Sequence, residues 1–160
     1  VKFENAKLFV DKYYASNGTE YFISFENEDR SILYGFVRLR FNKDSSKNIF
    51  NELKNAALIR ELHVYGSVTP VKEKDGNNAQ HFGFGKKLMM EAEKKARSEG
   101  YEKIAVISSI GTRNYYRKLG YELENLYMTK KLDKISTNKY IMLIISIGFI
   151  IAFLYNYLII

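Results

Sequence analysis

The sequence has no cysteine, only two histidines and a single proline. Without cysteine the chain can form no disulfide, no thiolate metal site and no cysteine-ligated iron–sulfur cluster of its own. The histidines, His63 and His81, are too far apart to make a metal signature, and His81 is better interpreted as a residue at a helix entry. We therefore predict no metal site. The proline, Pro70, lies in a turn-rich segment over 66–78, and no internal repeat is present.

The chain starts at Val1 with neither an initiator methionine nor a signal-peptide pattern, so we expect a fragment of a longer protein. At 160 residues it is long enough for one compact domain and too short for two. Its net charge is +7, and no charged residue follows Lys139. This basic balance suits a polyanionic partner, an anionic membrane surface, or only a solvated surface.

Residues 140–160 carry no charge and consist mainly of isoleucine, leucine, phenylalanine and tyrosine. At about 1.5 Å per residue, a helix of this length spans roughly the 30 Å hydrocarbon core of a bilayer. We therefore predict a transmembrane helix here, rather than a core helix that a second domain would have to bury. The lysines in and before a basic linker, 133–139, predict a tail anchor with the domain, 1–132, facing the cytosol. Its membrane would be the endoplasmic reticulum or the mitochondrial outer membrane.

The stretch from Gln80 to Gly85 contains two glycines and leads directly into an amphipathic run, Lys86 to Glu99. A glycine turn that opens a helix leaves the first amides without intrahelical partners, at the positive end of the helix dipole. Such a turn binds phosphate or pyrophosphate, so we predict an anionic cofactor. The alternative is an ordinary loop before a surface helix. Gly100 predicts the end of the helix.

One face of this helix is apolar and is expected to pack on the core. Its residues are Phe84, Leu88, Met89, Ala92 and Ala96. The opposite face is charged, and there we expect Glu93 and Arg97 to pair at i,i+4 spacing.

Hydrophobic periodicity predicts the remaining elements. Residues 1–15 have roughly helical spacing, whereas Tyr21–Glu26 and Ser31–Phe41 alternate as an antiparallel strand pair does. In that pair Arg38 and Arg40 project from the face opposite Val37, Leu39 and Phe41. Further on we expect a strand over 56–65 with Leu58, Leu62 and Val64 on one face, a buried strand over 104–107, a short helix over 112–119 and a strand over 121–132.

A strand, a glycine turn, a helix and a buried strand in this order form a right-handed βαβ unit, with the phosphate turn at its mouth. The predicted fold class is therefore α/β (α+β), with a mixed central sheet, flanking helices and one transmembrane helix.

Two motifs in the second half carry a family resemblance. Gln80, Gly83 and Gly85 form a Q-x-x-G-x-G pattern, and Tyr116 to Tyr121 reads Y-x-x-x-G-Y. Their order and spacing resemble the GCN5-related N-acetyltransferase superfamily. The strings RELHVYG and GTRNYYRKLGY are more specific, and with the helix they resemble the C-terminal acetyltransferase-like domain of the Elongator complex catalytic subunit. These blocks cover most of 56–132, and 18–41 matches more loosely.

The resemblance implies an acetyl-CoA site, where the residues alone predicted only an anion. The pyrophosphate would lie on the backbone amides from Phe82 to Lys86, and the pantetheine arm would lie along the strand. The implied cofactor-binding residues are Leu62, His63, Val64, Gln80, Phe82, Gly83, Phe84, Gly85, Lys86 and Tyr116.

The resemblance also implies catalytic roles. Tyr116, at the superfamily's tyrosine position, would protonate the departing CoA thiolate or orient the thioester, with help from Tyr115. Adjacent helical residues do not share a face, so one of the two tyrosines is expected to pack structurally. Glu61 and His63 are candidates for activating a nucleophile or water, although Glu61 could instead pair with Arg60.

In the Elongator family the acetyl group serves modification of C5 of the wobble uridine in tRNA. This implies tRNA and other Elongator-type subunits as partners. It also implies S-adenosylmethionine and a 4Fe-4S cluster in a radical domain that precedes this one. Two alternatives stay open: a protein lysine acetyltransferase of the histone or tubulin type with Glu61 as base, and a non-catalytic membrane tether that holds tRNA or partner subunits. The candidate phosphate contacts for tRNA are Arg38, Arg40, Arg113, Arg117 and Lys118.

Overall fold

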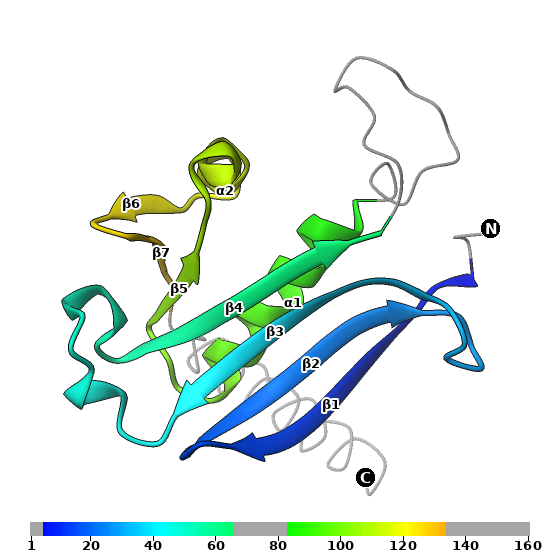
Figure 1. Cartoon of the computed structure of the whole chain (residues 1–160), viewed down its shortest axis with the longest axis horizontal. Coiled ribbons are helices and arrows are strands. Elements are labelled where there is room, and N and C mark those ends of the chain that lie inside the picture. Colours follow the sequence, from blue (N-terminus) through cyan, green and yellow to red (C-terminus); the bar gives the residue numbers. More distant parts are fainter. Residues whose placement is uncertain (1–4, 66–82, 134–160) are drawn as a thin grey trace, which may run out of the picture.

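The computed structural model describes residues 5–65 and 83–133, in which a seven-stranded sheet packs against one long helix (Figure 1). The strand order is β1-β2-β3-β4-β5-β7-β6, with β4 and β5 parallel and the other neighbours antiparallel. The predicted mixed α/β sheet is therefore confirmed.

The strands are β1 (Lys7–Ala15), β2 (Gly18–Glu26), β3 (Leu33–Asn42), β4 (Ala56–Val64), β5 (Lys103–Ile107), β6 (Glu122–Glu124) and β7 (Tyr127–Lys131). The helices are α1 (Phe84–Ser98) and α2 (Arg113–Lys118), with 3-10 turns η2 (Ser45–Lys47), η3 (Asn51–Leu53) and η4 (Ile110–Thr112).

The first strand corrects a prediction, because the helix expected over 1–15 is wrong where the structure describes that segment. Lys7–Ala15 pairs along its full length with β2, from Lys7 opposite Glu26 to Ala15 opposite Gly18. Ser16 and Asn17 both have positive φ, 43° and 59°, as a two-residue type I′ hairpin turn requires. Pairing with β2 therefore outweighs the weak helical spacing.

The β2–β3 hairpin has the predicted faces. Val37, Leu39 and Phe41 are buried under α1, and Arg38 and Arg40 project from the opposite side. We call this side, opposite α1, the outer face of the sheet.

Strand β4 contains a bulge that the sequence did not predict. Arg38 lies opposite Glu61 and Leu39 opposite Ile59, so Arg60 is an extra residue. Ile59 before the bulge and Leu62 and Val64 after it all belong to the main core. The expectation that Leu58 shares their face is wrong, because it packs in a separate cluster with Leu53, Ala56 and Ala105.

The helix α1 lies over β2, β3 and β4, as Figure 1 shows. All five residues predicted to face the core are at most 2 % exposed, which confirms its apolar face. Gly100 ends the helix as predicted, with φ +85° and hydrogen bonds that bring the amides of Gly100 and Tyr101 to the carbonyls of Arg97 and Ala96. Glu93 was predicted on the charged, solvent-facing side of this helix, but it is buried there, with only 5 % of it exposed.

The last predicted strand, Tyr121–Leu132, is instead a hairpin of β6 and β7. Asn125 has φ +51° and lies in the two-residue connection between Glu124 and Tyr127, which are paired. The left-handed conformation that asparagine tolerates reverses the chain there. As a result β7 pairs with both β5 and β6.

The membrane part of the predicted fold is contradicted. Among residues 5–65 and 83–133 no helix is long and apolar enough to cross a membrane, since α1 has 15 residues and α2 has 6. A spanning helix needs about 20 apolar residues. The stretch 140–160, for which the transmembrane helix was predicted, lies outside the described residues. The predictions of a transmembrane tail, a membrane partner and a tail-anchored location on an organelle are not kept.

Candidate active site

The candidate site lies where β4 and β5 separate. In the described part of the chain the last pair between them is Ile59 with Val106. β4 then continues past the bulge at Arg60 to Val64, while β5 ends at Ile107, and Figure 1 shows the two strands diverging. The backbone of β4 beyond the bulge therefore has no paired strand on its β5 side, and an extended ligand can bind to such an edge.

The glycine turn opens α1 beside the end of this β4 edge. Gly83 precedes the helix with φ +66°, and the first helical hydrogen bond runs from the amide of Lys87 to the carbonyl of Gly83. The amides of Gly85 and Lys86 thus come before the helical pattern, at the positive end of the dipole. Phe84 fixes the turn by packing its ring between Phe25 and Tyr34, with centroids at 4.8 and 6.0 Å. Gln80, His81 and Phe82 lie outside the described residues.

Gly85 is where three elements meet. A β-carbon built on it would lie 2.8 Å from the hydroxyl oxygen of Tyr115 on α2 and 3.5 Å from Cγ2 of Val64 on β4. Any side chain at Gly85 would therefore have to displace the Tyr115 hydroxyl. The structure thus brings the glycine turn to the β4 edge, as expected of the βαβ unit, and also places Tyr115 there, which the βαβ unit does not predict.

The two tyrosines have different environments. Tyr116 is 6 % exposed and belongs to the main core, with its ring at 6.0 Å from Tyr121 and 5.2 Å from Tyr115. Tyr115 is 37 % exposed and extends its hydroxyl to Gly85. Desolvation, with the nearby Tyr116, raises the pKa of Tyr115 to about 12, and burial raises the pKa of Tyr116. Both phenols therefore stay protonated and able to donate a hydrogen bond.

Glu61 and His63 lie on the outer face, away from Gly85 and Tyr115. Glu61 is 46 % exposed and 3.6 Å from the guanidinium of Arg38. His63 stacks against Phe36 at 6.0 Å and Tyr65 at 4.5 Å. The structure thus brings these two candidates together with each other but not with the tyrosines. The cation beside Glu61 is Arg38, whereas Arg60 binds Glu20.

The predicted phosphate contacts form two groups. On the outer face Arg40 is only 12 % exposed, and it donates to the side chain of Asn42 and the carbonyls of Ala15 and Ser16. On α2, Arg117 and Lys118 are exposed, and Arg117 donates to Asn114 at 2.7 Å. Arg113, at the start of α2, is partly buried.

A buried carboxylate, which was not predicted from the sequence, organises the outer face. Glu20 is 1 % exposed and accepts hydrogen bonds from the Tyr13 hydroxyl and from three guanidiniums. Burial alone would raise the pKa of Glu20, but these hydrogen bonds outweigh it and lower the pKa to about 2. The alternation of β2 places Glu20 on the same face as the β3 arginines, which was a usable signal. The three donors are Arg38, Arg40 and Arg60.

The environment of Glu93 was not predicted either. Its carboxylate accepts hydrogen bonds from Lys130 of β7 at 2.9 and 3.0 Å and from the Tyr121 hydroxyl at 3.1 Å. The predicted pair with Arg97 also forms, at 3.1 Å. No local pattern links β7 to α1, so only the periodicity of α1 could have hinted at this burial.

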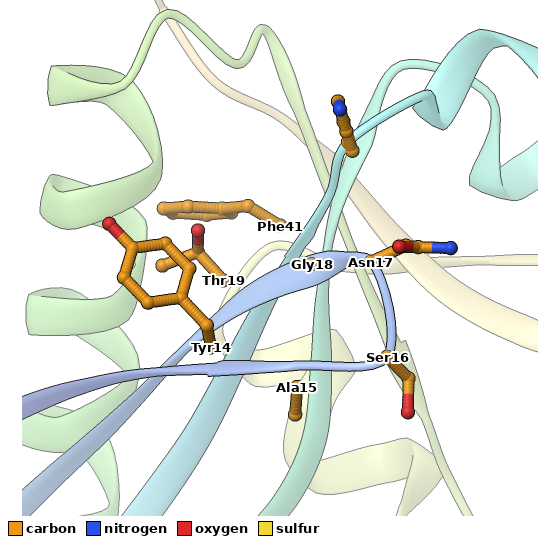
Figure 2. Close-up of a pocket in the computed structure, with 8 residues that line it drawn as sticks. Tyr14, Ala15, Ser16, Asn17, Gly18, Thr19 and Phe41 are labelled. Carbon is orange, nitrogen blue, oxygen red and sulfur yellow. The ribbon is translucent and has the colours of Figure 1, made fainter.

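A cavity of about 480 Å³ lies at the β1–β2 hairpin, where Tyr14, Thr19 and Phe41 gather on one side of the chain (Figure 2). Phe41 is at the β3 end that pairs with the start of β4, whereas Val64 pairs with Gly35 at the other end of β3. The cavity is therefore at the opposite end of the sheet from the glycine turn. Within residues 5–65 and 83–133 no cluster of three metal-binding side chains occurs.

Comparisons with known proteins identify a family and several relatives. The family model described as acetyltransferase (GNAT) family matches residues 3–121. Elongator complex protein 3 of Danio rerio is 53 % identical over 122 residues, covering 75 % of this chain and 22 % of that protein. The Saccharomyces cerevisiae protein of the same name is 47 % identical over 133 residues, 81 % of this chain and 24 % of the relative.

Among solved structures, archaeal Elp3 of Methanocaldococcus infernus with an N-terminal deletion is 44 % identical and superposes with a TM-score of 0.68. The match covers 81 % of this chain and 30 % of that one. The chain thus spans about a quarter of the length of the curated relatives it matches.

Proposed function

The chain belongs to the acetyltransferase (GNAT) family, and on that premise we propose that it is the acetyl-CoA-binding acyltransferase domain of an Elongator-type catalytic subunit that acts on tRNA. The observation that carries the proposal is the meeting of the glycine turn, the open edge of β4 and the tyrosine pair at Gly85. Identity near 50 % to Elongator complex protein 3 supports the Elongator assignment.

The residues present fit the cofactor. The amides of Gly85 and Lys86 lie at the helix N-terminus, where a pyrophosphate is favoured. From Val64 back to the bulge at Arg60 the strand spans about 13 Å, at about 3.3 Å per residue. That edge offers backbone groups to the amides of an extended pantetheine arm. Acetyl-CoA would supply an acetyl group activated as a thioester.

The cofactor would run along β4 from its pyrophosphate at Gly85 to its thioester near the bulge at Arg60, and this separates the roles of the two tyrosines. The thioester is a full pantetheine arm away from the pyrophosphate, so the hydroxyl of Tyr115, beside Gly85, belongs to the phosphate end. We assign it to cofactor binding. Tyr116 is deeper in the core, and we assign it to the sulfur end, where it would donate a hydrogen bond to the departing thiolate. Their raised pKa values favour hydrogen-bond donation over ionisation.

The acyl acceptor would approach from the outer face near the bulge. Glu61 and His63 are exposed there and can accept a proton from the acceptor or from water. On α2 the exposed Arg117 and Lys118 offer charges to the tRNA backbone. Arg40, with its guanidinium held by internal partners, is assigned to the stability of this face. The radical chemistry with S-adenosylmethionine and a 4Fe-4S cluster would belong to the rest of the longer protein.

An assay of acetyl-CoA hydrolysis tests the proposal, with the chain alone, with tRNA and with a histone-tail peptide. We expect acetyl-CoA binding in calorimetry and turnover stimulated by tRNA. Stimulation by the peptide alone would indicate a lysine acetyltransferase instead, and tRNA binding without turnover would indicate a non-catalytic module.

The tRNA contact is tested with Lys118→Ala against Lys54→Ala, an exposed lysine near the start of β4 as a matched control. Lys118→Ala is expected to weaken tRNA binding and to reduce the slope of log affinity against log salt by about 1. An equal loss in Lys54→Ala would mean that the effect comes from net charge and not from α2.

A further inference from the structure

The helix α2 carries the tyrosine pair but is only six residues long. A helix of this length is not stable by itself, so its position depends on contacts to other elements. At its C-terminal end the carbonyls of Tyr116 and Arg117 accept the amides of Leu119, Gly120 and Tyr121, so the chain closes the helix there. Contacts between this end and other elements therefore help to fix where Tyr116 lies.

One lysine makes such a contact. Nζ of Lys130, on β7, donates to the carbonyl of Leu119 just after α2, at 2.9 Å. The same Nζ contacts both carboxylate oxygens of Glu93 at 2.9 and 3.0 Å. Gly120, with φ +84°, passes close by, since a β-carbon there would lie 3.6 Å from Cε of Lys130. Lys130 thus ties the end of α2 to the middle of α1.

A second connection, through Tyr121, links the same carboxylate to Tyr116 of α2. The hydroxyl of Tyr121 donates to Glu93 at 3.1 Å, and its ring packs edge-on against Tyr116 at 6.0 Å. Tyr121 is 1 % exposed, and burial together with the charge of Glu93 raises its pKa, so it stays a hydrogen-bond donor. Glu93 is therefore joined to Tyr116 through one hydrogen bond and one aromatic contact.

A buried carboxylate with these partners is costly to desolvate, and an apolar side chain of similar volume would often serve stability as well. What the ion pair adds is a fixed geometry between three elements. We propose that Glu93 and Lys130 are positioning residues that hold α2 against α1, so that Tyr116 is oriented for acyl transfer. This inference rests on the proposed function for its catalytic readout.

The variants that test it are Glu93→Gln and Lys130→Met, with Lys130→Arg as the conservative change. The control is Arg97→Gln, which removes another partner of the same carboxylate but one on α1 itself. In acetyl-CoA hydrolysis we expect kcat to fall at least tenfold in the first two variants. Because Tyr115 lies on the same helix, the dissociation constant of acetyl-CoA should rise by no more than the three- to tenfold expected for Tyr115→Phe. The conservative variant should recover part of kcat, and Arg97→Gln should retain it.

Hydrogen exchange of the peptide over 113–119 gives a readout that does not depend on turnover. Exchange there should rise about tenfold in Lys130→Met, while the peptide over 84–92 stays protected. Unchanged kcat and unchanged exchange in folded variants would overturn the inference, as would an equal loss of kcat in Arg97→Gln. If the wild type binds no acetyl-CoA but the exchange of α2 responds as stated, the proposed function fails and the positioning contact stands.

Discussion

The hydroxyl of Tyr115 lies so close over Gly85 that a β-carbon on the glycine would be 2.8 Å from its oxygen. These residues are 30 positions apart in the sequence and belong to different helices. Their contact lies at the first turn of α1, to which we assign the pyrophosphate of the proposed cofactor. The absence of a side chain at Gly85 therefore matters for Tyr115 as much as for the cofactor.

Replacing Gly85 by alanine should displace the Tyr115 hydroxyl and raise the dissociation constant of acetyl-CoA about tenfold. Alanine in a helical turn normally stabilises by about 0.5–1 kcal/mol relative to glycine, but the contact with Tyr115 should cancel that gain. In a Tyr115→Phe background the contact is absent, so Gly85→Ala should then raise the free energy of unfolding. Denaturant unfolding of the four proteins of this cycle measures the coupling, and additive free energies would contradict the contact.

Removing the two hydroxyls one at a time should separate binding from catalysis. Tyr115→Phe is expected to raise the KM for acetyl-CoA three- to tenfold with kcat little changed. Tyr116→Phe is expected to lower kcat at least tenfold with little change in KM, because its hydroxyl would act only on the departing thiolate. Steady-state kinetics with tRNA present decide between the roles, and the reverse pattern would exchange the two assignments.

The carboxylate of Glu20 should make the protein sensitive to acid. Its pKa is about 2 in the folded chain against 4.5 in the reference state, so the ionised form stabilises the fold above about pH 4.5, and this contribution is lost as the pH falls toward 2. The full shift corresponds to roughly 3 kcal/mol. In urea unfolding at pH 7 and pH 3, Glu20→Gln should be less stable at pH 7 and should lose less stability on acidification. A parallel pH dependence in the variant would contradict this role.

Alanine substitution of Gly120 tests the turn that follows α2, and Gly111, which lies before α2, serves as the control. Gly120 has φ +84°, whereas a β-carbon on Gly111 would meet nothing within 4 Å and its φ is not in the left-handed region. Gly120→Ala should cost about 1 kcal/mol or more of unfolding free energy, because alanine is strained at positive φ. Gly111→Ala should be neutral or slightly stabilising. Thermal unfolding of both variants measures the difference, and equal melting temperatures would argue against strain at Gly120.

Part of the fold follows from local signals. The apolar face of α1, the end at Gly100 and the antiparallel pair of β2 and β3 were predicted, because each depends on periodicity or on one residue's backbone freedom. The glycine turn of Gly83 and Gly85 was placed correctly at the start of α1 for the same reason. The membrane helix was not supported, and its segment lies outside the described residues.

Errors occurred where a distant partner decides the conformation. Lys7–Ala15 became a strand because β2 offers it a full ladder of hydrogen bonds, which helical spacing over 1–15 could not reveal. The bulge at Arg60 changes which residues of β4 share a face. Leu58, before the bulge, therefore faces away from the side that carries Leu62 and Val64. Burial of Glu93 depends on Lys130, 37 residues away.

The sequence by itself determined α1, the β2–β3 pair, the glycine turn before α1 and the residue types available for chemistry, since these are set within a few neighbouring positions. Only the tertiary structure decided which side chains meet. It gave Tyr115 and Tyr116 different surroundings, placed Glu61 beside Arg38 and His63 against Phe36, and joined Glu93 to the end of α2. The physical reason is that burial and pairing depend on long-range packing, which a local pattern does not contain.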